Sequence, residues 1–166
     1  MKSSLFMDFS VDKGKNQINV TREFAAPLKH VWAAWTEKEL LDQWWAPKPW
    51  KAKTKARDFK EGGYWLYAMV GPEGEEHWAR ADFKSIDPQK KIELQDAFCD
   101  AYGKLNMDFP RTKWKIAFSE TTAGTTVQVE LTYEKLEDLE MIISMGFKEG
   151  FLMALENLDG VLAAQK

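Results

Sequence analysis

Eight tryptophans in 166 residues limit what this chain can fold into, and four of them lie between Trp32 and Trp45. Each such side chain buries roughly 150–250 Å² of surface when it packs inside a protein. So much rigid aromatic surface must either fill a thick core or line the wall of a hydrophobic cavity. The second interpretation indicates a binding function.

The composition is that of an ordinary globular protein, and it argues against some partners. Apolar residues make up 45% of the chain and charged residues 30%, which is typical of soluble domains. The 23 basic and 26 acidic residues give a net charge of −3. Without a basic excess to neutralise phosphates, we expect no nucleic-acid partner. The local basic run from Lys48 to Arg57 is expected to be the solvated face of a strand.

The sequence carries no sign of secretion or membrane insertion. Residues 1–5 lack the apolar core of a signal segment, and no apolar run approaches the roughly 20 residues that span a membrane. The lone Cys99 cannot form an internal disulfide. We therefore expect a cytoplasmic protein with no membrane span, and its oligomeric state is left open.

Alternating apolar side chains predict a hairpin at the start of the chain. Residues 5–11 and 18–24 show this alternation on either side of a polar turn at 12–16. The first of these strands, within 5–15, would be an extra strand at the edge of the sheet.

Two short helices are expected after this hairpin. Pro27 suits the first position of a helix, and Leu28, Val31 and Trp35 then recur at helical spacing. Thr36 and Glu39 have the spacing of a capping box, which predicts the start of a second short helix.

The rest of the chain predicts a sheet followed by a long helix. Alternation of period two favours strands near 51–59, 64–70, 76–86, 91–98, 112–119 and 125–134. Apolar residues from Leu139 to Leu162 then repeat every three or four positions. We predict an α+β fold in which a curved antiparallel sheet of six to seven strands wraps around one long C-terminal helix over 138–164.

Several stretches resemble one known superfamily over about residues 16 to 164. The opening resembles the START-like, birch-pollen-allergen-like (SRPBCC) helix-grip superfamily, and later stretches resemble its branch of homologues of the activator of heat-shock-protein-90 ATPase. The residues that carry the resemblance are Val20–Pro27, Val31–Thr36, Leu40–Pro47, Phe59–Trp65, Gly124–Thr126 and Met145–Gly150.

The resemblance implies a single helix-grip domain over 1–166 with a deep hydrophobic cavity, which different members of the superfamily use for lipids, plant hormones or polyketides. The name of the branch implies an alternative role in which the chain contacts a chaperone and stimulates its ATPase. The segment from Pro47 to Lys55 could then form a contact patch.

Aromatic and flexible side chains are the candidates for the cavity wall. Methionine repacks around varied ligand shapes, and Gly146 with Gly150 could open a gap for a ligand or let the helix approach bulky rings. The predicted ligand-binding residues are Trp45, Trp65, Tyr67, His77, Phe98, Trp114, Met141, Met145 and Phe151. The alternative is that these side chains simply fill the core.

Few groups suggest catalysis, and we predict no catalytic set, no metal site and no cofactor. The candidate metal ligands His30, His77 and Cys99 are scattered, and Cys99 is expected to be a buried structural thiol. Arg80 and Asp82 share a strand face, and we favour a solvent-facing ion pair over a polar anchor inside the cavity. A reaction in the cavity through Tyr67, His77 or Arg80 remains as a further hypothesis.

Overall fold

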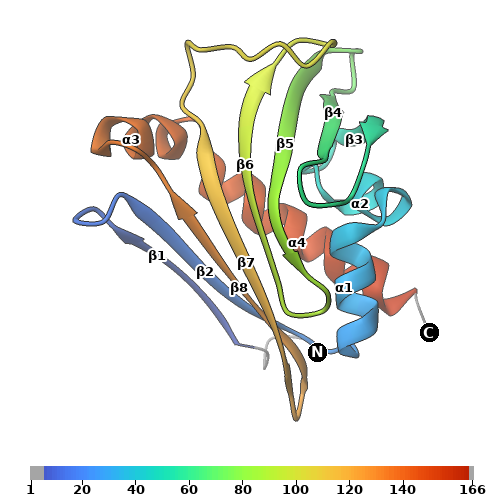
Figure 1. Ribbon diagram of the computed structural model, residues 1–166. Helices are drawn as coiled ribbons and strands as arrows, with labels where there is room; N and C mark the ends of the chain where they lie inside the picture. Colours follow the sequence, from blue (N-terminus) through green and yellow to red (C-terminus); the bar gives the residue numbers. More distant parts are fainter. Residues whose placement is uncertain (1–5, 165–166) are drawn as a thin grey trace.

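The computed structural model describes residues 6–164, so Leu5, which the predicted hairpin includes, lies outside the described part. One eight-stranded antiparallel sheet has the strand order β1-β2-β8-β7-β6-β5-β4-β3 (Figure 1). The strands are β1 (Met7–Asp12), β2 (Gln17–Phe24), β3 (Lys51–Arg57), β4 (Tyr64–Val70), β5 (Glu76–Asp87), β6 (Lys91–Cys99), β7 (Thr112–Thr121) and β8 (Gly124–Thr132). The α+β helix-grip prediction is confirmed, with one strand more than the predicted six to seven.

The strand boundaries follow from the alternation of apolar residues. In β7, Trp114, Ile116 and Phe118 are buried, whereas Lys113 and Lys115 between them are exposed. Alternate side chains point to opposite faces of a strand, so one face of the sheet is apolar and is covered by helices. Within the described residues, β1 pairs only with β2 and forms one edge of the sheet, as the hairpin pattern predicted.

The helices are α1 (Leu28–Thr36), α2 (Lys38–Trp44), α3 (Leu136–Ser144) and α4 (Phe147–Ala163). α4 crosses the apolar face of the sheet and contacts both α1 and α2 (Figure 1). Its buried side chains include Phe151, Leu155 and Leu158. They pack with the inner face of the sheet into one hydrophobic core.

The predicted capping box is wrong. α1 extends through Thr36, whose hydroxyl donates a 2.7 Å hydrogen bond to the Trp32 carbonyl within the same helix. Glu37 therefore occupies the N-cap position of α2, and no side chain caps this helix. A hydroxyl inside a helix can satisfy itself on a carbonyl one turn back, and here that bond replaces the cap.

The single long helix predicted over 138–164 is also wrong, because the chain breaks it into α3 and α4. Met145 ends α3, and Gly146 has the left-handed backbone conformation with φ of 89°. Glycine adopts this conformation without steric cost and commonly ends helices in this way. The apolar spacing continues through the break, so the periodicity of the sequence did not predict the change of direction.

Candidate functional site

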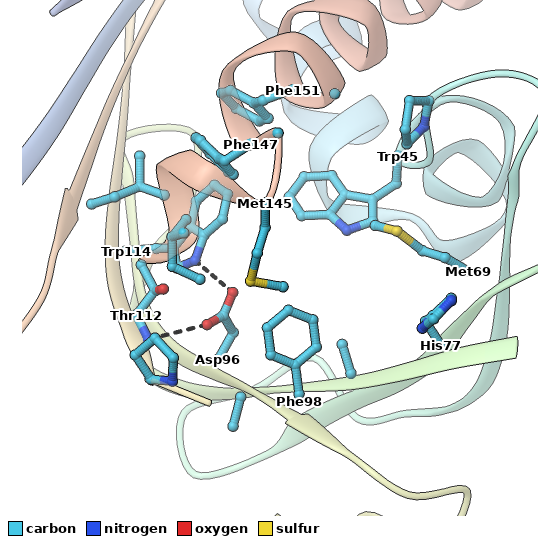
Figure 2. Close-up of a pocket in the computed structure, with 18 of the residues that line it drawn as sticks. Trp45, Met69, His77, Asp96, Phe98, Thr112, Trp114, Met145, Phe147 and Phe151 are labelled. Atoms are coloured by element: carbon cyan, nitrogen blue, oxygen red, sulfur yellow. Dashed lines mark hydrogen bonds between the residues drawn. The ribbon is translucent and has the colours of Figure 1, made fainter. Parts of the chain in front are cut away.

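A cavity of about 260 Å³ lies between the sheet and the junction of α3 with α4. Strands β4 to β8 supply its floor and walls, and the two helices supply its roof (Figure 2). An engineered apolar cavity of about 150 Å³ binds benzene, so this space is large enough for a small organic molecule. Its lining includes Trp45, Met69, Phe98, Trp114, Ile142, Phe147 and Phe151.

The aromatic rings of the wall contact one another in edge-to-face, tilted and stacked arrangements. The ring centre of Trp114 lies 5.7 Å from Trp45 and 5.7 Å from Phe151, and Phe147 stacks on Phe151 at 5.2 Å. Such separations are favourable for aromatic pairs. Each ring is therefore held in place by its neighbours, and these contacts support the wall of the cavity.

One carboxylic acid faces this apolar space. Asp96 of β6 accepts a 2.8 Å hydrogen bond from the Trp114 indole Nε1 and a 3.2 Å bond from the Thr112 backbone N–H (Figure 2). Burial raises the pKa of the Asp96 carboxyl to about 6, and the hydrogen bonds from Trp114 and Thr112 limit the rise. A carboxyl group poised in this range is mainly ionised at neutral pH.

Two phenol groups add to the polar part of the cavity. The Tyr67 hydroxyl accepts a 2.9 Å hydrogen bond from the Trp45 Nε1. The Tyr133 hydroxyl is buried and has no hydrogen-bond partner of acceptable geometry among residues 6–164, although Thr112 lies nearby. Burial raises the pKa of both hydroxyls well above the usual value, so both stay protonated.

The exposed lining residues mark the mouth of the cavity. Met145 is 50% exposed although it reaches into the cavity from the α3–α4 junction (Figure 2). His77, at the start of β5, is exposed as well and packs against the Trp50 ring at 5.2 Å. A ligand would therefore enter between this junction and the beginning of β5.

The structure brings seven of the nine predicted residues to the cavity wall: Trp45, Tyr67, His77, Phe98, Trp114, Met145 and Phe151. Trp65 instead borders a neighbouring space of about 30 Å³ and stacks on Tyr67 at 4.1 Å. That space is about the volume of one water molecule. Whether the seven residues bind a ligand stays a prediction.

The placement of Met141 in the wall is wrong. Its side chain is 40% exposed, and the buried residues of α3 are Leu139 and Ile142. The break at Gly146 turns α3 away from the direction of α4, so the two helices do not share one continuous inner face. Ile142 takes the place on the wall that the continuous helix would have assigned to Met141.

Asp96 and Tyr133 were missed, although a signal for Asp96 exists. Residues 92, 94, 96 and 98 share one face of a strand by simple alternation, and Phe98 was already assigned to the wall. An acidic residue between apolar ones on that face indicates an inward carboxyl group. Tyr133 continues the alternation of Val127, Val129 and Leu131 within the strand predicted over 125–134, so its inward position had a signal as well.

The ion pair predicted for Arg80 and Asp82 is confirmed. Arg80 Nη2 lies 2.9 Å from Asp82 Oδ1, both side chains are partly exposed, and neither residue lines the cavity or the smaller space beside it. A polar anchor made of these two residues is therefore wrong, and a reaction inside the cavity could not use Arg80. Ala81 and Phe83 point to the buried side as expected.

Other reactive groups give little support to catalysis. Partial burial raises the pKa of Cys99 to about 11, so the thiol is protonated at neutral pH and is a poor nucleophile. Among residues 6–164, no three histidine, cysteine or acidic side chains come together in a way that could hold a metal ion. In the same part of the chain, no helix has the length and apolar character needed to cross a membrane.

Comparison with protein-family models gives one match, over residues 25–163, to the family described as Activator of Hsp90 ATPase homolog 1-like protein. The chain belongs to this family. The match covers all four helices and six of the eight strands, β3 to β8. A search of curated proteins gives no match.

Solved bacterial structures share the fold over nearly the whole chain. Protein Ms6760 from Mycobacterium smegmatis is 28% identical with a TM-score of 0.88, and the match covers 98% of this chain and 99% of that one. A protein from Arthrobacter aurescens is 28% identical with a TM-score of 0.89, covering 95% and 91%. Protein NE0264 from Nitrosomonas europaea is 26% identical with a TM-score of 0.81, covering 93% and 98%.

Proposed function

We propose that this protein binds a small hydrophobic or amphipathic molecule in the cavity between the sheet and the α3–α4 junction, without transforming it. The observation that carries the proposal is a space of about 260 Å³ walled by aromatic and flexible side chains. Small-molecule sites are concave and mostly apolar, with a few polar groups that orient the ligand. We also propose that it acts in the cytoplasm.

The volume restricts the ligand. Typical sites for drug-sized molecules measure about 300–1,000 Å³, so a space of about 260 Å³ suits a molecule of one or two rings. A complete phospholipid would not be enclosed. Met145 and His77 at the mouth could move aside for a substituent that extends into solvent.

Native mass spectrometry of freshly purified protein tests the proposal, together with titration by one- and two-ring aromatic compounds followed through tryptophan fluorescence. We expect either a retained small molecule or saturable quenching, because Trp45 and Trp114 border the cavity. Absence of both across a broad panel would contradict the proposal.

A second candidate function is association with a chaperone, which the family description favours. A specific surface could serve it: Lys51, Lys53 and Lys55 are exposed on β3, at the edge of the sheet. Lysines on an edge strand also discourage edge-to-edge aggregation, so the surface has an ordinary explanation as well. The test is whether the protein accelerates the ATPase of an Hsp90 chaperone and whether replacing the three lysines by glutamine abolishes the acceleration.

A further inference from the structure

We infer that the cavity selects a ligand whose apolar, ring-sized body carries a positively charged amine, with Asp96 as the counter-ion. This inference rests on the proposed function and narrows it to a class of ligand. Three features of the cavity carry it: the free bonding capacity of the Asp96 carboxylate, the lack of a cation paired with it among residues 6–164, and the Tyr133 hydroxyl, which has no hydrogen-bond partner of acceptable geometry among the same residues.

The Asp96 carboxylate has bonding capacity left over. Each of its oxygens accepts one hydrogen bond, from Thr112 or from Trp114. A carboxylate has about four acceptor positions, so about two remain, and the group lines the cavity (Figure 2). An ammonium group of a ligand could donate to these positions at the short distances typical of charge-assisted bonds.

No basic side chain among residues 6–164 forms an ion pair with Asp96. Arg111 acts on it only from a longer range and pairs with Asp82 at 3.6 Å. A buried charge without a partner is costly, and a cationic ligand would relieve that cost. The surrounding rings of Trp45, Trp114 and Phe151 also attract cations through their faces.

Tyr133 supplies a second polar contact. Its hydroxyl is buried, borders the same cavity and lacks a hydrogen-bond partner among the described residues. An unpaired buried hydroxyl normally costs free energy, which a ligand in the cavity could recover by donating to its oxygen. An ammonium group has three donors, enough for Asp96 and Tyr133 together.

The same arrangement disfavours acidic ligands. A fatty acid or an aromatic acid would bring a second negative charge next to Asp96 in an apolar space, and like charges repel strongly where water is excluded. The inference therefore separates amines and neutral donors, which should bind, from carboxylates, which should not.

Three small molecules of nearly the same shape test this selection: phenethylamine, 2-phenylethanol and phenylacetate. Their dissociation constants are measured by calorimetry at pH 7.5 on the whole protein. We expect phenethylamine to bind at least tenfold more tightly than 2-phenylethanol, which is about 1.4 kcal/mol. Phenylacetate should bind more weakly than the alcohol.

Two variants, Asp96→Asn and Tyr133→Phe, and one control variant test which side chains bind the ligand. Asp96→Asn should bring the amine and the alcohol to similar affinities, whereas Asp87→Asn, which removes the same charge from an exposed turn, should leave the preference intact. Tyr133→Phe should weaken both ligands severalfold, because it removes a buried hydroxyl that has no hydrogen-bond partner of acceptable geometry among residues 6–164. If Asp96→Asn fails to fold, the relative affinities of the three small molecules for the unaltered protein still decide the selection.

The outcomes distinguish this inference from the proposed function. If the alcohol binds and the amine binds no more tightly, or if Asp96→Asn retains the preference, the selection for amines is wrong while a binding cavity stands. If neither these compounds nor ethylbenzene bind, the binding function itself is contradicted.

Discussion

The interior beneath α4 has a filled end and a hollow end, and both are rich in aromatic rings. At the filled end, next to α1 and α2, Trp44 is completely buried and its ring centre lies 4.8 Å from that of Trp35. The space left there is only about 30 Å³. At the hollow end, near the α3–α4 junction, Trp114 and Phe151 border about 260 Å³.

The difference teaches that ring content alone does not decide whether an interior is packed or open. At the filled end, α1 and α2 bring side chains toward the sheet from two directions, and Trp44 Nε1 donates a 2.8 Å bond to the Ala34 carbonyl. At the hollow end, Gly146 and Gly150 face the cavity without side chains. The break at Gly146 also lifts α3 out of the line of α4.

The largest expected effect comes from opening the filled end. Trp44→Ala should lower the free energy of unfolding by about 3–5 kcal/mol, because it removes a fully packed ring and leaves a new void. Phe147→Ala at the hollow end should cost about half as much or less, since this side chain is half-buried and already borders open space. Urea denaturation measures both. Equal losses would contradict the distinction between the two ends.

The hollow end should also make stability depend on pH. The ordinary pKa of Asp96 is 3.8, and burial raises it to about 6 in the folded protein. Between about pH 4 and pH 6 the unfolded chain loses its proton first, so the free energy of unfolding falls as pH rises. The total loss should be on the order of 2–3 kcal/mol. Asp96→Asn should lack this loss.

Urea denaturation at pH 4, 5.5 and 7 measures this difference between the protein and Asp96→Asn. Other ionisable groups at the cavity are Tyr67, His77, Tyr133 and the more distant Arg111, and the lining residues of α3 and α4 have no ionisable side chain. Because His77 lines the mouth of the same cavity, both proteins are also compared in a His77→Gln background. If the free energy of unfolding changes with pH equally in the protein and in Asp96→Asn, Asp96 is not the source of the pH dependence.

Filling the hollow end should abolish binding without harming the fold. A β-carbon at Gly150 would meet Pro47 Cγ at 3.6 Å, an ordinary contact, and a leucine there should occupy part of the cavity. Gly150→Leu should weaken binding of 2-phenylethanol at least tenfold.

Gly160→Leu is the matched control, because Gly160 lies on the same helix in open space. Both variants should gain helix propensity of up to about 1 kcal/mol. Equal affinity in the two variants would place the ligand elsewhere.

The smallest expected effect separates two methionines. Met145→Gln should change the affinity for 2-phenylethanol a few fold, because Met145 lines the mouth. Met141→Gln should leave it unchanged, since Met141 is exposed and lies on neither cavity wall. Calorimetry on the two variants compares them directly. A larger effect from Met141 would restore the role predicted for it from helical periodicity.

Much of the fold could be predicted from local patterns. The strand boundaries at β4 match the alternation to the residue, and those of β5, β6, β7 and β8 differ from it by one or two residues. Phe98 in β6 could be assigned to the inner surface for the same reason, whereas Trp45 lies just after α2, outside any strand. The break in the C-terminal helix was missed because apolar spacing is nearly continuous through Met145 and Gly146, and only the backbone conformation interrupts it.

The polar part of the site was harder to predict. In the sequence, nothing but its strand face distinguishes Asp96 from the other acidic residues. Its position in the cavity depends on hydrogen bonds from Trp114 and Thr112, which belong to the next strand, β7. Tyr133 comes to the same place from beyond the end of β8. The meeting of these residues depends on which strands pair and in which register, which a single stretch of sequence does not encode.

Local residue patterns were enough to predict most helices and strands, the apolar face of the sheet and the aromatic rings of the interior. These follow from residue types and their spacing, since burial of one face of each element is a local requirement. Only the tertiary structure decided where that interior is solid and where it is open. Packing density depends on which side chains from distant elements meet, and the missing side chains at Gly146 and Gly150 leave the space that Asp96 faces.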